Sequence, residues 1–171
     1  MKRKSRLQNN IGSSIQRERL QKVTTALGQP PVVVSVGGSM VSVSIPDRLP
    51  LSKDGLRGLV NILYDKAHEV SHAIGDNWFP VGGAWLNVDS DSPIVKLFKK
   101  EGVVDRNRDY RIEGVGYISK NYDRGYSLHF EYPKCTATES QSLNYHTPMY
   151  QLAQQILARM GVRSNLHTYV D

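Results

Sequence analysis

Residues 52–75, SKDGLRGLVNILYDKAHEVSHAIG, decide the fold predicted for this chain. Their apolar residues recur every three or four positions, which is the spacing of one face of a helix. Ser52 is suited to cap the first turn, and Gly75 is suited to end the last one. We therefore expect one long amphipathic helix here, with an apolar stripe made of Leu56, Leu59, Val60, Leu63, Ala67, Val70 and Ile74.

The segments around this helix read mainly as β-strands. Residues 32–45, VVVSVGGSMVSVSI, alternate Val and Ser around two glycines, which indicates either a hairpin or one long strand with a bulge. Residues 82–89, GGAWLNVD, suit a short strand. The segments YRIEGVGYIS and YSLHFEY flank the turn KNYDRG and predict an antiparallel hairpin, in which His129 points away from the core.

Two further helices are expected. Pro93 opens a brief one that stops at Gly102, and residues 147–148, Thr-Pro, open another that runs to Gly161. Residues 133–144 are polar and read as a loop. The fold class predicted is α+β, in which a long amphipathic helix and a C-terminal helix pack on a small antiparallel sheet.

Length and charge divide the chain into an arm and a body. A chain of 171 residues suits one domain, which we place at residues 30–171, after the boundary GQPP. The formal net charge is +6, and residues 1–22 account for all of it. Residues 1–28 are therefore expected to form a flexible basic arm that binds polyanions, either RNA or an anionic membrane surface. Its basic residues are Lys2, Arg3, Lys4, Arg6, Arg17, Arg19 and Lys22.

The long helix also carries a motif of zinc peptidases, His68-Glu69-x-x-His72. Two histidines four residues apart lie on one helix face, where both can bind zinc, and the glutamate can act as general base. Gly75 continues the pattern HExxHxxGxxH of metzincins, but Trp78 stands where the third zinc ligand belongs. A small zinc metallopeptidase with Glu69 as catalytic base is therefore one hypothesis. An ordinary polar helix face, with no cofactor, is the one we favour.

The order of the elements resembles that of the matrix proteins of rhabdoviruses, and in size the chain is similar to the short matrix proteins of plant-infecting members. The resemblance covers residues 1–160 and includes YRIEGVGYIS, which looks like the glycine-containing strand after the helices in that family. The budding motif PPxY of animal-virus members is missing, because QPPVVV has the prolines without the tyrosine.

This resemblance implies a non-enzymatic structural protein that self-associates and bridges the nucleocapsid and the inner membrane surface. It would act in the virion and the host cytoplasm, peripheral to the membrane. The sequence agrees with this, because it has neither an apolar signal segment nor an apolar run long enough to span a bilayer. Trp78, Phe79 and Trp85 are aromatic residues suited to contacts between copies.

Overall fold

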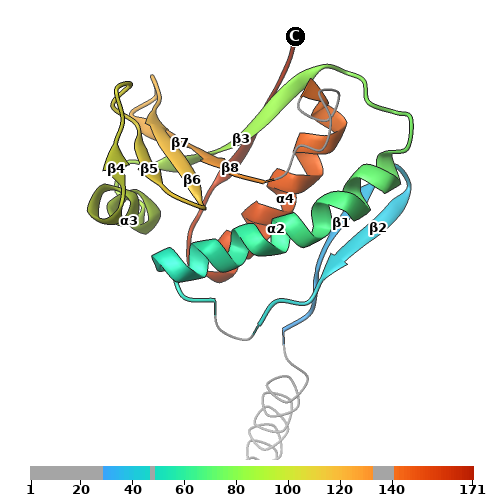
Figure 1. Ribbon diagram of the computed structural model, residues 1–171, viewed down its shortest axis with the longest axis horizontal. Coiled ribbons are helices and arrows are strands. Elements are labelled where there is room, and N and C mark those ends of the chain that lie inside the picture. Colours follow the sequence, from blue (N-terminus) through green and yellow to red (C-terminus); the bar gives the residue numbers. More distant parts are fainter. Residues whose placement is uncertain (1–28, 47–48, 133–140) are drawn as a thin grey trace, which may run out of the picture. The chain divides into compact units, whose positions relative to one another are not determined.

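A computed structural model describes residues 29–46, 49–132 and 141–171 of the chain. The chain divides into two compact units, Met1–Pro30 and Pro31–Asp171. The basic residues of the predicted arm all lie outside the described residues. The helices and strands that the structure describes all lie in the second unit (Figure 1).

The long helix α2 spans Lys53–Ile74, as predicted. The Ser52 hydroxyl accepts a hydrogen bond from the Gly55 backbone N–H at 3.0 Å, which satisfies one of the unpaired donors of the first turn. At the other end Gly75 has φ +61°, a conformation that favours glycine, and its N–H bonds back to the last turn. All seven residues of the apolar stripe are buried.

The Val/Ser segment forms a hairpin, which is one of the two predicted alternatives. Strands β1 (Val32–Val36) and β2 (Ser39–Val43) pair antiparallel across Gly37 and Gly38, both of which have positive φ. The valines of one face are buried, while the serines between them are exposed. This hairpin packs against α2 and α4 and forms its own two-stranded sheet.

A second, six-stranded antiparallel sheet holds the rest of the β-structure, in the order β4-β5-β6-β7-β3-β8 (Figure 1). The predicted hairpin around KNYDRG is present as β6 and β7, and GGAWLNVD is β3. The segment YRIEGVGYIS was predicted as a single strand and is wrong in this respect, because Tyr110–Ile112 form a separate strand, β5, that pairs antiparallel with β6. Strand β8 was not predicted. The strands are β3 (Gly82–Asp89), β4 (Val103–Val104), β5 (Tyr110–Ile112), β6 (Gly116–Lys120), β7 (Gly125–Phe130) and β8 (Asn165–Val170).

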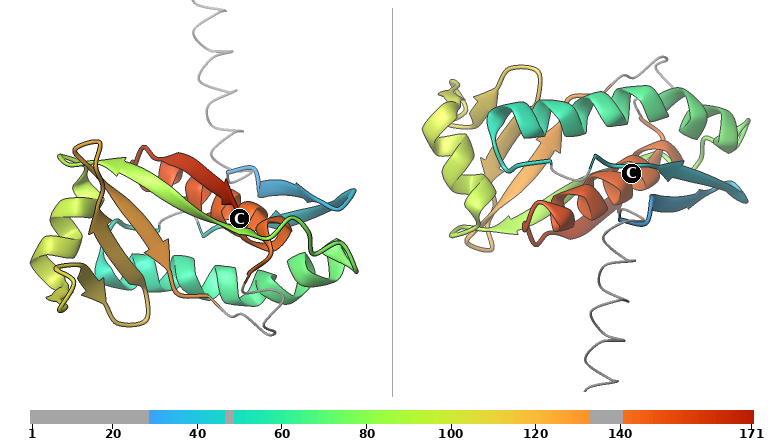
Figure 2. Two further views of the ribbon diagram at one scale, coloured as in Figure 1. Left: turned by 90° about the horizontal axis from the view of Figure 1, so that it is seen from above. Right: turned by 90° about the horizontal axis from the view of Figure 1, so that it is seen from below.

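The remaining helices are α3 (Pro93–Glu101) and α4 (Leu143–Arg159). The structure corrects the predicted start of the C-terminal helix, because α4 begins at Leu143 and Pro148 lies inside it. Pro148 lies beyond the four N–H groups that lack an intrahelical partner, so its ring removes the donor that would bond the carbonyl of Asn144. In Figure 2, α3 lies at the β4–β5 end of this unit and the β1–β2 hairpin at the opposite end.

Burial alternates along β3 and along most of β6 and β7, the central strands of the six-stranded sheet. Leu86, Val88, Ile118 and Leu128 are buried on the face that the helices cover, and the residues between them are half-exposed. The predicted fold class is thus confirmed: an α+β unit with a long helix and a C-terminal helix against an antiparallel sheet. None of the helices described is long and apolar enough to cross a bilayer.

Candidate functional site

Aromatic side chains line up across the half-exposed face of the sheet. Tyr117 of β6 pairs in register with His129 of β7, and Trp85 of β3 pairs with His167 of β8. Since paired residues of neighbouring strands project to the same side, these four rings form one line. We call Tyr117, His129, Trp85 and His167 the aromatic row. Arg111 of β5, which pairs with Tyr117, stands at its end.

The rings of the row are in contact with one another. Tyr117 and His129 are stacked, with centroids 4.6 Å apart and ring planes 12° from parallel. The centroid of Trp85 lies 4.4 Å from that of His167 and 6.0 Å from that of His129. The guanidinium of Arg111 lies over the Tyr117 ring at 4.9 Å, within cation–π range. The result is a continuous line of contacting rings across four strands, with Arg111 of a fifth strand at its end.

Polar neighbours orient Trp85 within the row. Its indole Nε1 donates to Oδ1 of Asn87 at 3.0 Å, two residues along the same strand face. The same oxygen accepts a hydrogen bond from the Ser127 hydroxyl at 3.2 Å, across the β3–β7 pairing. Because both donors converge on one amide oxygen, they fix the side chain of Asn87, and Asn87 in turn fixes the indole.

The sheet opens next to this row. Strands β3 and β7 pair only through residues 86–89 and 125–128, so the first half of β3 is paired with β8 and not with β7. Where the two strands diverge, a pocket of about 390 Å³ opens between them. That volume lies within the range of small-ligand sites, at its lower end.

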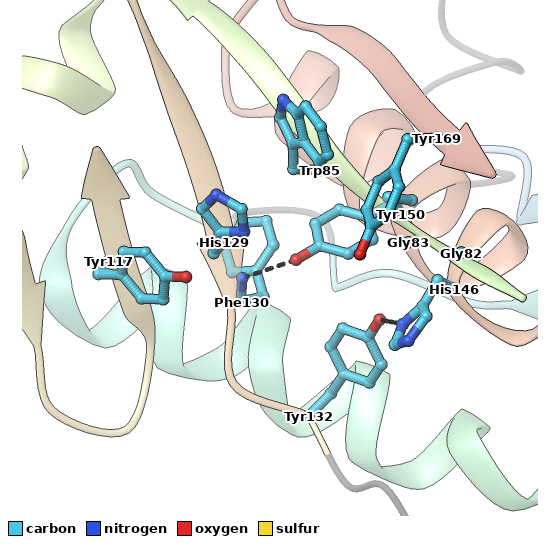
Figure 3. A pocket seen from close by; sticks show the side chains of 11 residues that line it. Gly82, Gly83, Trp85, Tyr117, His129, Phe130, Tyr132, His146, Tyr150 and Tyr169 are labelled. Carbon is cyan, nitrogen blue, oxygen red and sulfur yellow. Dashed lines mark hydrogen bonds between the residues drawn. The ribbon is translucent and has the colours of Figure 1, made fainter. Parts of the chain in front are cut away.

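The pocket has an aromatic rim and a buried floor (Figure 3). Half-exposed rings of Trp85, Tyr117, His129 and Tyr169 form the rim, while side chains from the end of β7 and from α4 form the floor. Phe130, Tyr132, His146 and Tyr150 make up this floor, and each is less than a tenth exposed.

Hydrogen bonds fix the floor. Tyr132 Oη bonds to Nδ1 of His146, and Oη of Tyr150 accepts from the backbone N–H of Phe130 at 3.2 Å. Burial raises the pKa of the Tyr132 hydroxyl well above its usual range, and burial also raises the pKa of Tyr150. Both phenols are therefore neutral at physiological pH.

The glycines at the start of β3 shape one side of the pocket. Gly83 pairs with Tyr169, and a Cβ at this position would lie 2.6 Å from the Tyr169 ring. The ring therefore lies directly over bare backbone. A Cβ on Gly82 would lie 2.0 Å from the carbonyl oxygen of Tyr169, so this position has no room for any side chain while β8 is paired.

Charge around the site is sparse. Arg111 makes an ion pair with Glu131 at 2.8 Å, and burial, followed by the nearby charge of Asp109, raises the pKa of Tyr117. The described pocket lining contains neither a carboxylate nor a lysine or arginine. Residues 31–171 carry equal numbers of basic and acidic side chains. This site can therefore stack flat rings and exchange hydrogen bonds, but it has little charge with which to bind phosphate.

The residues of the predicted zinc site lie elsewhere, in the last turns of α2. His68, Glu69 and His72 are all exposed, and Glu69 is 2.7 Å from the ammonium of Lys66 in an ion pair. Among the residues that the structure describes, no group of three or more His, Cys, Asp or Glu side chains could hold a metal. A catalytic zinc needs three protein ligands, and the described donors do not supply the third. His68 and His72 lie on one exposed face of α2, and the residues described form no metal-binding group with them.

The sequence analysis did not identify the row or the pocket. It correctly placed His129 on the face away from the core, by alternation along one strand. Phe79 is exposed, in line with a surface role, whereas Trp78 and Trp85 are half-buried. No prediction joined Trp85 to His129, because they are 44 residues apart in sequence and only the pairing of β3 with β7 brings them together. Comparison with protein-family models, curated proteins and solved structures found no match to this chain.

Proposed function

We propose that this chain is a non-enzymatic, matrix-like structural protein that binds single-stranded RNA of a nucleocapsid on the aromatic row. The basic N-terminal residues would attract RNA phosphates or the anionic inner surface of a membrane, and the folded unit would self-associate. Such a protein would act in the virion and the host cytoplasm, peripheral to the membrane. The observation that carries the proposal is the line of contacting π-faces across the open sheet face.

Stacking explains how a sheet face with little charge can bind RNA. Every nucleobase has a π-face, and bases of single-stranded RNA stack on exposed aromatic side chains with little regard to sequence. The row offers rings on adjacent strands, and the pocket beside Trp85 can take a ring edge against the Tyr132 and Tyr150 floor. A matrix protein that coats a whole genome needs binding of this sequence-tolerant kind.

The charge distribution supports a division of work between the two parts of the chain. Residues 1–22 hold the entire net charge of +6, while residues 31–171 are neutral. Phosphate attraction weakens steeply with salt, whereas stacking does not. We therefore assign the salt-sensitive part of RNA affinity to the N-terminal residues and the salt-resistant part to the row.

Replacing Trp85 tests this proposal. Loss of one stacked base costs about 1–3 kcal/mol, so Trp85→Ala should weaken binding of an unstructured oligonucleotide about 5- to 150-fold at high salt. Trp85→Phe keeps a ring at the same place and should retain most of the affinity. Tyr64→Ala and Phe79→Ala remove exposed aromatic residues outside the row and serve as controls. Equal affinity of Trp85→Ala and wild type, with both folded, would refute the proposal.

A further inference from the structure

Strand β8 forms one edge of the six-stranded sheet, and among the residues that the structure describes no strand pairs with its outer side. It is six residues long and pairs with β3 on one side only. Its sequence, NLHTYV, contains no lysine, arginine, acidic residue or proline. Those residues are the ones with which edge strands ordinarily block pairing with other chains. Nothing in the composition of β8 opposes such pairing.

The opposite edge of the same sheet is protected. Strand β4 is only two residues long, whereas β8 is six residues long. Very short edge strands are poor templates for another strand. The contrast singles out β8, where the side chain of Val170 is 62% exposed and that of Tyr169 is 44% exposed.

We infer that β8 pairs antiparallel with β8 of a second copy, around a two-fold axis at Thr168. This inference rests on the self-association in the proposed function and names its interface. If the two-fold axis is perpendicular to the sheet, one residue of β8 must lie opposite the same residue of the second copy. Only then does each face of one sheet continue into the same face of the other. The pairing joins two six-stranded sheets into one.

The side chains of β8 favour Thr168 as the central residue. With Thr168 on the axis, Leu166 faces Val170 of the second copy on the helix-covered side, so two apolar residues meet. On the open side His167 faces Tyr169 of the second copy, and the aromatic row continues across the interface. With His167 on the axis, two imidazoles would face each other and Leu166 would meet a threonine. The register centred on Thr168 therefore pairs apolar residues with apolar residues and rings with rings.

Disulfide trapping tests this register in the full-length chain. Residues that face each other in an antiparallel pair have Cα atoms about 4.5–5.5 Å apart, within the range a disulfide spans. With the single cysteine removed by Cys135→Ser, Thr168→Cys should form a covalent dimer under mild oxidation. His167→Cys should react more slowly, and Val103→Cys, on the exposed edge strand β4, is the matched control. Dimer formation by Val103→Cys at the same rate, or faster trapping through His167→Cys, would overturn the inference.

Sedimentation without RNA provides the second measurement. Wild type should dimerise with rising concentration, and Thr168→Lys, which puts a charge on the edge, should raise the dissociation constant about tenfold or more. Tyr117→Ala removes a ring of the row from β6, which is separated from β8 by two strands, and should dimerise as wild type does, so a failure of RNA binding and a failure of edge pairing are told apart. A monomeric wild type at high concentration, or unchanged assembly of Thr168→Lys, would contradict the β8 interface.

Discussion

Removal of the Tyr150 hydroxyl should destabilise the folded unit by about 1–3 kcal/mol. The ring is 4% exposed, and its oxygen accepts the Phe130 N–H at 3.2 Å. Tyr150→Phe leaves that buried donor without its partner, which costs more than the bond itself contributes. Urea denaturation of Tyr150→Phe should show a lower midpoint with an unchanged slope. Tyr122→Phe removes a hydroxyl from a fully exposed ring and should leave the midpoint unchanged.

Tyr150 and Tyr132 should also make the folded unit less stable as the pH becomes alkaline. Burial raises the pKa of Tyr150 and Tyr132 in the folded state, so the folded protein holds these protons more tightly than the unfolded chain. Their contribution is fully present below the unfolded tyrosine pKa of about 10 and is lost as pH rises above it. Each phenol should lower the unfolding free energy by about 1.4 kcal/mol per pH unit there. Tyr150→Phe should therefore show a shallower loss. An unaltered midpoint at neutral pH together with an unaltered alkaline slope would refute the reasoning.

Three further outcomes are expected. Gly116→Ala should lower the free energy of unfolding by several kcal/mol. A Cβ at this residue, which has φ +143°, would lie 1.9 Å from the carbonyl oxygen of His129 and break the β6–β7 pairing. Gly38→Ala is the control, because Gly38 also has positive φ but nothing lies within 4 Å of its Cβ. Deletion of residues 2–22 should weaken association with RNA and with anionic vesicles. For RNA, the steepness of log affinity against log salt should fall by up to about 5. A salt dependence equal to that of wild type would count against the arm. Metal analysis of purified protein should find less than stoichiometric zinc, and His68→Ala with His72→Ala should change nothing; zinc bound one to one and lost in that variant would restore the peptidase hypothesis.

Local patterns were enough to predict the helices and most strands. Helix α2 was predicted with its true limits because Ser52, the apolar stripe and Gly75 act within a few residues of one another. The start of α4 was placed four residues late, because a Thr-Pro pair is typical of a helix start, whereas here Pro148 lies inside the helix. Strand β8 has mostly exposed side chains and exists through its pairing with β3, about 80 residues earlier in the chain. No local pattern within residues 165–170 predicts that pairing.

The candidate site depends even more on long-range order. Alternation along β7 was sufficient to turn His129 away from the core, but its neighbours Trp85 and Tyr117 come from other strands. A shift of one residue in any of these pairings would send a ring to the buried face. The pocket requires in addition that β3 be separated from β7 before Leu86, a divergence that no local motif encodes. In contrast, the zinc motif is local and readily seen, yet its third ligand is missing among the residues described.

The most direct test of the aromatic row is the fluorescence of Trp85 itself. The chain has two tryptophans, so Trp78→Phe leaves Trp85 as the sole indole reporter. Titration with an unstructured RNA oligonucleotide at high salt should quench its emission as bases stack on the ring, and Tyr117→Ala should shift the titration to higher RNA concentration. Unchanged Trp85 emission, at RNA concentrations where an independent assay shows the protein saturated, would contradict binding at the row.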